Sequence, residues 1–179
     1  MRKKIFHLYR RLLWSPLKYA KYLGVSIGKD CWIATRYFGS EPYLITIGDH
    51  VQITGGVRFF THGGGWILRE EQPDFDAFGK IKIGNNVYIG SCSMIMPGVT
   101  IGNNIIIGAG SVVTRSVPDG VLLAGNPARI IGTIDDYKQR MQKYNTRSKQ
   151  LGKREKMTYL LSISENRFIK RPLMDKLEK

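Results

Sequence analysis

Histidine changes charge near neutral pH and can accept a proton or bind a metal, and this 179-residue chain has three, His7, His50 and His62. A zinc site built from histidines needs three together, and His7 lies in an N-terminal segment apart from the other two, so we expect no metal site. His62 is followed directly by Gly63 and a long irregular stretch. This position leaves two interpretations open: a solvated histidine at a corner of the fold, or a general base.

The two cysteines, Cys31 and Cys92, have neither the spacing of metal ligands nor that of a disulfide framework. A chain of this length with 42% hydrophobic residues can form a core without such links, so a reducing cytoplasm is the simplest setting. Nothing close to Cys92 in the sequence supplies the base that a nucleophilic thiol requires. We therefore expect no covalent intermediate on cysteine.

A repeat forms the scaffold that must position these residues. Residues 83–100 read IGNNVYIGSCSMIMPGVT and residues 101–118 read IGNNIIIGAGSVVTRSVP, two consecutive blocks of 18. Within them an apolar residue recurs at every sixth position, and the same spacing fits the chain upstream. The positions are Ile27, Ile33, Ile47, Ile53, Phe59, Ile83, Ile89, Ile95, Ile101, Ile107 and Val113.

A period of six fits neither an amphipathic helix, with about 3.6 residues per turn, nor a long alternating strand. Glycine follows the apolar position at 28, 48, 84, 90, 102 and 108, which favours one short strand and one turn in each unit. The 18-residue block then predicts three sides per coil. We expect an all-β fold, a parallel β-helix of stacked three-sided coils around a column of apolar side chains.

The flanking segments and two interruptions depart from this repeat. Residues 1–24 are basic and place apolar residues at helical spacing, and residues 133–179 are polar, basic and compatible with helix. We expect short helical segments there, with the coils over 25–132. A short interruption lies at 36–44, and a longer one at 63–80 is predicted to be an extruded loop. Long loops in a regular scaffold usually carry function.

The net charge of +14 is carried by the ends of the chain. Residues 1–24 contain seven Lys or Arg and no acid, residues 25–137 contain eight against ten acids, and residues 138–179 contain thirteen against four. The ends are therefore where contact with an anionic membrane would occur. No motif supports nucleic-acid binding, and no apolar run suits a signal peptide or a membrane span. We expect a cytoplasmic protein, with peripheral membrane contact as an alternative.

Three features make the chain resemble the hexapeptide-repeat acyltransferases, close to the galactoside, maltose and xenobiotic O-acetyltransferases and their polysaccharide-modifying relatives. They are the IGxxVxIG units, SVVTRSVP at 111–118 and the closing AGNPARII at 124–131. The resemblance covers residues 25–132. It implies a left-handed β-helix and a homotrimer with active sites between subunits. It also implies acetyl-CoA as donor, with direct transfer of the acetyl group to a hydroxyl of a sugar or polysaccharide.

The resemblance also implies roles for single residues. A histidine before the extruded loop takes the proton of the acceptor hydroxyl in such enzymes, which makes His62 the expected catalytic base. The positions expected to bind coenzyme A are Ser91, Ala109, Thr114, Arg115 and Arg129. The loop residues expected to bind the acceptor are Trp66, Glu70 and Glu71. The candidates for orienting His62 are Glu70, Glu71, Asp74 and Asp76, with a backbone carbonyl as an alternative.

Two other functions stay open at this point. The same scaffold and histidine would suit an N-acyltransferase acting on an amino-sugar nucleotide, because an ammonium group must also lose a proton before it attacks. A non-catalytic trimeric scaffold at a membrane surface is the third hypothesis, and it depends on the basic ends.

Overall fold

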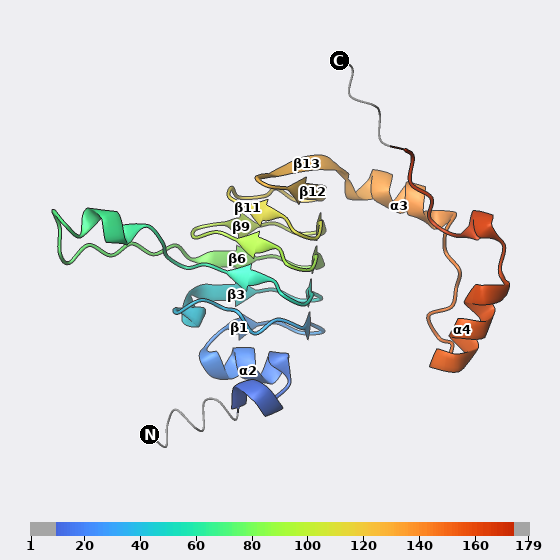
Figure 1. Ribbon diagram of the computed structural model, residues 1–179, viewed down its shortest axis with the longest axis horizontal. Coiled ribbons are helices and arrows are strands. Elements are labelled where there is room, and N and C mark those ends of the chain that lie inside the picture. Colours follow the sequence, from blue (N-terminus) through green and yellow to red (C-terminus); the bar gives the residue numbers. More distant parts are fainter. Residues whose placement is uncertain (1–9, 174–179) are drawn as a thin grey trace, which may run out of the picture. The chain divides into compact units, whose positions relative to one another are not determined.

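The computed structural model describes residues 10–173, in which the strands form sheets of four, six and three strands. The four-stranded sheet contains β1 (Ser26–Ile27), β3 (Ile45–Ile47), β6 (Ile81–Ile83) and β9 (Thr100–Ile101). The six-stranded sheet contains β2 (Trp32–Ile33), β4 (Gln52–Ile53), β7 (Val87–Ile89), β10 (Ile105–Ile107), β12 (Val121–Gly125) and β13 (Ala128–Thr133). The three-stranded sheet contains β5 (Arg58–Phe59), β8 (Met94–Ile95) and β11 (Val112–Val113). The chain visits the sheets in turn, so its coils stack on one another (Figure 1).

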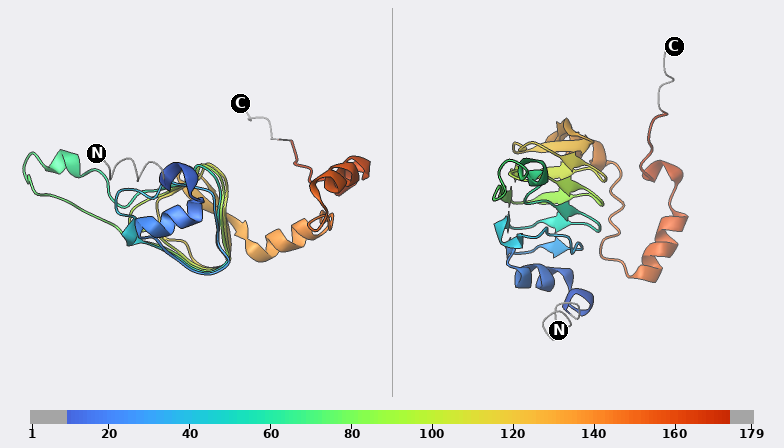
Figure 2. Two further views of the ribbon diagram at one scale, coloured as in Figure 1. Left: turned by 90° about the horizontal axis from the view of Figure 1, so that it is seen from below. Right: turned by 60° about the vertical axis from the view of Figure 1, so that its left-hand side comes forward.

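Parallel pairing between neighbouring coils gives the length of each circuit. Val87 pairs with Ile105, 18 residues later, as the sequence block predicts. Ile45 pairs with Ile81, 36 residues later, because that circuit includes the loop at 63–80. Seen along the stack, the coils have three sides, and the loop leaves from one corner (Figure 2, left). The expectation of a parallel β-helix with three-sided coils is confirmed.

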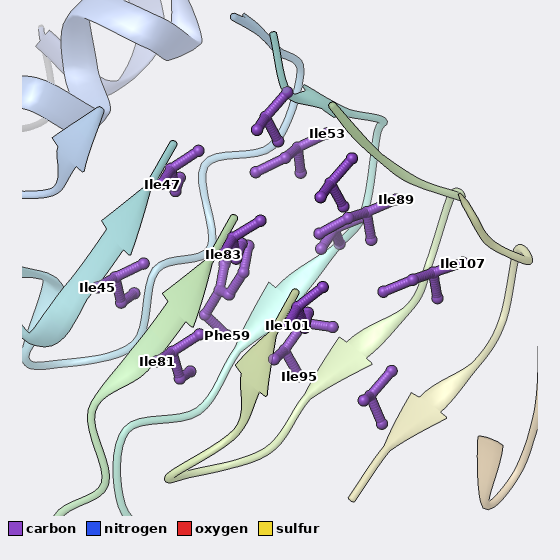
Figure 3. Close-up of a cluster of buried hydrophobic side chains, with 14 of the residues drawn as sticks. Ile45, Ile47, Ile53, Phe59, Ile81, Ile83, Ile89, Ile95, Ile101 and Ile107 are labelled. Atoms are coloured by element: carbon purple, nitrogen blue, oxygen red, sulfur yellow. The ribbon is translucent and has the colours of Figure 1, made fainter. Parts of the chain in front are cut away.

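The interior of the coils is a column of apolar side chains (Figure 3). Ile53, Ile89 and Ile107 are completely buried, and every predicted inward position is buried except Ile27, which is half-buried in the first coil. Full burial of such a side chain stabilises the fold by about 1.5–3 kcal/mol. Each six-residue unit forms one short strand and one turn and points two side chains inward. This arrangement explains why apolar residues recur with a period of six.

The helix α2 (Pro16–Leu23) lies across the N-terminal end of the stack (Figure 1) and follows a helical turn at 10–13. The Ser15 side chain caps its first turn, and proline suits the start of a helix because the first N–H groups have no partner within it. The helix ends at Gly24, whose φ of 101° favours glycine. The predicted N-terminal helical segment also includes residues 1–9, which lie outside the described residues.

The antiparallel hairpin of β12 and β13 ends the coils, and the chain beyond Ile134 forms a second compact unit. α3 (Ile134–Gln142) begins at the boundary, and the second unit also contains α4 (Lys153–Ser162) and the 3-10 helix η3 (Glu165–Arg167). The expected helical extension is therefore interrupted over 143–152. Asn145 accepts a hydrogen bond from the backbone N–H of Arg147, whose φ is 53°, and such local bonds compete with helix.

Two further 3-10 helices belong to the described part of the coil unit, η1 (Pro42–Leu44) and η2 (Gly65–Leu68). The first lies in the short interruption and the second in the extruded loop. No helix within residues 10–173 is both long enough and apolar enough to cross a membrane.

Candidate functional site

His62 lies where the coil that contains β5 opens into the extruded loop. The root of the loop is closed by a hydrogen bond from the Gly79 N–H to the Thr61 carbonyl oxygen, 2.7 Å, and by an antiparallel bridge between His62 and Phe78. The Phe78 ring stands edge-on to the imidazole, with 5.6 Å between the ring centroids. The backbone of His62 and one side of its ring are therefore held in place.

The short interruption before β3 brings a carboxylate to this histidine. Phe38 is buried, and its ring stacks on that of Phe59 with 5.5 Å between centroids, which fixes the segment against the next coil. Gly39 has a φ of 70°, and a Cβ there would lie 3.1 Å from Thr61 Oγ1, so glycine allows the chain to pass close by. Glu41 follows, directly before η1.

Glu41 and His62 form a hydrogen-bonded pair. Glu41 Oε2 lies 2.8 Å from His62 Nδ1 and also accepts a hydrogen bond from the Thr61 hydroxyl. The bond from Thr61 is the largest cause of a lowered pKa for Glu41, burial opposes it, and the bond from His62 adds to it. Because Glu41 is then a carboxylate at neutral pH, Nδ1 of His62 carries the proton and Nε2 presents its lone pair.

The exposures of the two side chains differ in a way that suits proton transfer. The Glu41 side chain is 14% exposed and that of His62 is 42% exposed. The orienting carboxylate is thus largely enclosed, while the imidazole can be reached by another molecule.

The predicted set of orienting acids was wrong. Within residues 10–173, none of the loop acids Glu70, Glu71, Asp74 and Asp76 forms a hydrogen bond or ion pair with His62, and Asp76 instead pairs with Arg69 at 3.4 Å. No local motif in the sequence marks Glu41 as the partner. The first two coils are offset by 20 residues where Trp32 pairs with Gln52 and by 21 where Tyr37 bridges Arg58, so the spacing alone does not place Glu41 beside Thr61.

A hollow of about 610 Å³ opens beside His62. Thr61 and His62 line one part of it, and Arg36, Tyr37 and Arg58 line another. Binding sites for small molecules span roughly 300–1,000 Å³, so the hollow has room for a sugar. A hydroxyl of a molecule bound there would lie within reach of the imidazole.

Three of the five residues predicted to bind coenzyme A meet at another hollow. Thr114, Arg115 and Arg129 line this hollow of about 270 Å³ together with apolar side chains. Two guanidinium groups beside an apolar wall are suited to phosphate groups. Ser91 and Ala109 do not line it. They stack on successive coils, where the Gly110 N–H donates to the Ser91 carbonyl oxygen at 2.8 Å.

The loop residues predicted to bind the acceptor lie apart from His62 in the single chain. Trp66 and Glu70 line a hollow of about 360 Å³ at η2, and Glu71 is exposed on the loop. The Trp66 side chain is 84% exposed, and the loop extends away from the coils (Figures 1 and 2). The role of these three residues stays a prediction.

His50 differs from His62 although both occupy the same place in their six-residue units. It is exposed at a corner with a φ of 54°, and its Nδ1 lies 2.9 Å from Asn86 Oδ1. Its partner is a neutral amide, whereas His62 has a carboxylate. His50 therefore occupies a surface corner of the coils.

Comparison with known proteins gives consistent matches over the coils. Residues 80–115 match the family described as bacterial transferase hexapeptide (six repeats). Protein CapG of Staphylococcus aureus is 52% identical over 173 residues, which are 94% of this chain and 99% of that protein. The galactoside O-acetyltransferase of Escherichia coli K12 is 38% identical over 122 residues, 68% of this chain and 60% of that protein.

The solved structures include a hexapeptide-repeat-containing acetyltransferase of Vibrio cholerae in complex with acetyl coenzyme A. It is 33% identical to this chain, with a TM-score of 0.56 over 62% of this chain and 61% of that one.

Proposed function

Because the chain belongs to the hexapeptide-repeat family of bacterial transferases, we propose that it transfers an acetyl group from acetyl-CoA to a hydroxyl of a sugar or polysaccharide. The observation that carries the proposal is the 2.8 Å contact between Glu41 Oε2 and His62 Nδ1 beside a sugar-sized hollow. The relatives named as a galactoside O-acetyltransferase and as an acetyltransferase bound to acetyl-CoA support the same chemistry.

His62 acts as the general base in this proposal. Its Nε2 takes the proton of the acceptor hydroxyl while the oxygen attacks the carbonyl carbon of the thioester. The carbon–sulfur bond then breaks, and His62 returns the proton to the departing thiolate. Glu41 keeps the imidazole in the required tautomer and stabilises its transient positive charge. General base catalysis contributes about 10²–10⁴ to the rate, which fits a hydroxyl acceptor.

The donor site would use both groups of predicted residues. Arg115 and Arg129, with Thr114, are placed to bind the phosphate groups of coenzyme A, and Ser91 and Ala109 to line its pantetheine arm. These groups line different places on one chain. As the family resemblance implies, the proposed assembly is a homotrimer of left-handed coils in which neighbouring subunits complete each active site. The exposed Trp66, Glu70 and Glu71 would then approach the acceptor on a neighbouring subunit.

The test is turnover of acetyl-CoA, followed as release of free thiol, against a panel of sugars, amino sugars, nucleotide sugars and oligosaccharides. His62→Asn should lower kcat by about 10²–10⁴ and leave the affinity for coenzyme A unchanged, because only the base is lost. His50→Asn is the matched control, since asparagine also tolerates the positive φ at that corner.

Wild-type turnover in His62→Asn would contradict the mechanism. Mass spectrometry of the product separates an O-acetyl ester from an N-acetyl amide, so N-acylation of an amino sugar would be seen directly. Absence of transfer to every acceptor of the panel would count against the proposed activity itself.

A further inference from the structure

The hollow beside His62 has an unbalanced charge. Arg11, Arg36 and Arg58 all line it, and none of its lining residues is an aspartate or glutamate. Within residues 10–173, no carboxylate lies within ion-pair distance of these three arginines. Glu41, the acid nearest in sequence to Arg36, is bonded to Thr61 and His62 beside the hollow, and both of these partners are uncharged. Three cations against this one carboxylate leave a net positive charge, which produces a positive potential in the hollow.

The arginines come from three different elements, which converge on one place. Arg11 belongs to the helical turn at 10–13, Arg36 to the short interruption and Arg58 to β5. Solvated charges on a helix or strand need not converge in this way. The convergence favours a binding function over a set of ordinary surface charges.

Arg36 is held in place but keeps an unused donor. Its Nη2 donates to the Trp14 carbonyl oxygen at 2.6 Å, and its guanidinium lies 5.8 Å from the centroid of the Tyr19 ring. Its Nη1 is buried and has no hydrogen-bond partner in the part of the chain that the structure describes. A buried donor without a partner costs free energy, which an acceptor oxygen bonded to it would offset.

Arg58, unlike the half-buried Arg36, is exposed. Its guanidinium lies over the Tyr37 ring, 5.1 Å from the centroid, and both residues line the hollow. A guanidinium stacked in this way keeps its N–H edge available for hydrogen bonds in the ring plane.

From this arrangement we propose that the acceptor is a sugar that carries a diphosphate, with the phosphates bound by Arg11, Arg36 and Arg58 and the reacting hydroxyl at His62. The inference rests on the proposed function, because it identifies the class of acceptor for that reaction. A diphosphate matches three guanidinium groups better than a single carboxylate does, since it offers more charge and several oxygens for paired N–H donors. Nucleotide-linked and lipid-linked sugars both present this group.

The experiment measures binding by calorimetry to the full chain saturated with coenzyme A, so that the donor site is blocked. The probes are pyrophosphate, uridine diphosphate N-acetylglucosamine, farnesyl diphosphate N-acetylglucosamine and the neutral methyl N-acetylglucosaminide. Wild-type protein should bind the diphosphate probes at least about tenfold more tightly than the neutral sugar, and added salt should weaken only that binding. The nucleotide and lipid probes distinguish the two sources of the diphosphate.

Arg58→Gln and Arg36→Gln should each weaken binding of pyrophosphate about tenfold or more. Arg58 is exposed, so its variant stays informative if replacement of the half-buried Arg36 destabilises the fold. Lys82→Gln is the matched control, because Lys82 is an exposed cation on β6 that does not line the hollow.

Equal affinity for charged and neutral probes, no binding of any diphosphate probe, or equal losses in Arg58→Gln and Lys82→Gln would overturn the inference. So would an Arg58→Gln variant that changes only the oligomeric state. The two proposals fail separately. If turnover depends on His62 but binding does not depend on the arginines, only the diphosphate acceptor is refuted. If binding depends on the arginines but no acetyl group is transferred, the diphosphate site stands, whereas the activity and the role of the ligand as acceptor are refuted.

Discussion

Replacement of Glu41 by glutamine isolates the effect of its charge on His62. Both the imidazole Nδ1 and the Thr61 hydroxyl bond to the same oxygen of Glu41. An amide oxygen in that place can accept both bonds without moving the chain, so the variant keeps the geometry and removes the negative charge. The expected result is a lower kcat with an unchanged KM for acetyl-CoA, because the donor site is not touched.

The magnitude follows from the contact between Glu41 and His62. A hydrogen bond to a charged partner contributes about 1.5–3 kcal/mol and a neutral one about 0.5–1.5 kcal/mol, so loss of the charge costs about 1–1.5 kcal/mol. The His62 side chain is 42% exposed, and screening by solvent favours the lower end of this range. Since about 1.36 kcal/mol corresponds to a tenfold change in rate, kcat should fall roughly five- to tenfold.

The assay is thiol release at saturating acetyl-CoA and acceptor. Asp74→Asn is the control, because it removes an exposed carboxylate of the loop that forms no contact with His62 in the described residues. A wild-type kcat in Glu41→Gln would refute the orienting role of the carboxylate. Equal losses in both variants would show that general charge, and not this hydrogen bond, matters.

Other outcomes follow from the same structure. Because the pKa of Glu41 is lowered in the folded state, its ionisation stabilises the fold above the usual pKa of 4.5, and this contribution is lost as pH falls through the lower folded pKa. Chemical denaturation should therefore show wild type losing stability relative to Glu41→Gln on acidification. A difference in stability that stays constant with pH would contradict this. Arg115→Gln and Arg129→Gln should each raise the KM for acetyl-CoA about tenfold with little change in kcat, and unchanged steady-state values would remove them from the donor site. Ile89→Ala should lower the free energy of unfolding by about 2–5 kcal/mol in urea denaturation, since Ile89 is completely buried, and a loss below about 1 kcal/mol would contradict the role of the column.

The buried column could be predicted in detail because its signal is local and repeated. Ile89 and Ile107 occupy the same place in consecutive 18-residue blocks, and the structure pairs them across β7 and β10. Each six-residue unit must bury the same two inward positions, so a period of six in the sequence identifies the interior. The interruption of the C-terminal helical segment was missed, because the bond from Arg147 to Asn145 competes with a helix-compatible composition.

The site was predicted only in part. The sequence by itself, with its family resemblance, predicted His62 as the base and grouped Thr114, Arg115 and Arg129, which the structure brings to one hollow. Only the tertiary structure showed that Glu41 meets His62, that three arginines share its hollow, and that Ser91 and Ala109 lie elsewhere. The physical reason is register. Which residues of neighbouring coils meet depends on the length of each coil, and the first two coils are offset by 20 residues instead of 18. A repeat determines which side chains point inward, whereas stacking decides which polar groups on different coils come together.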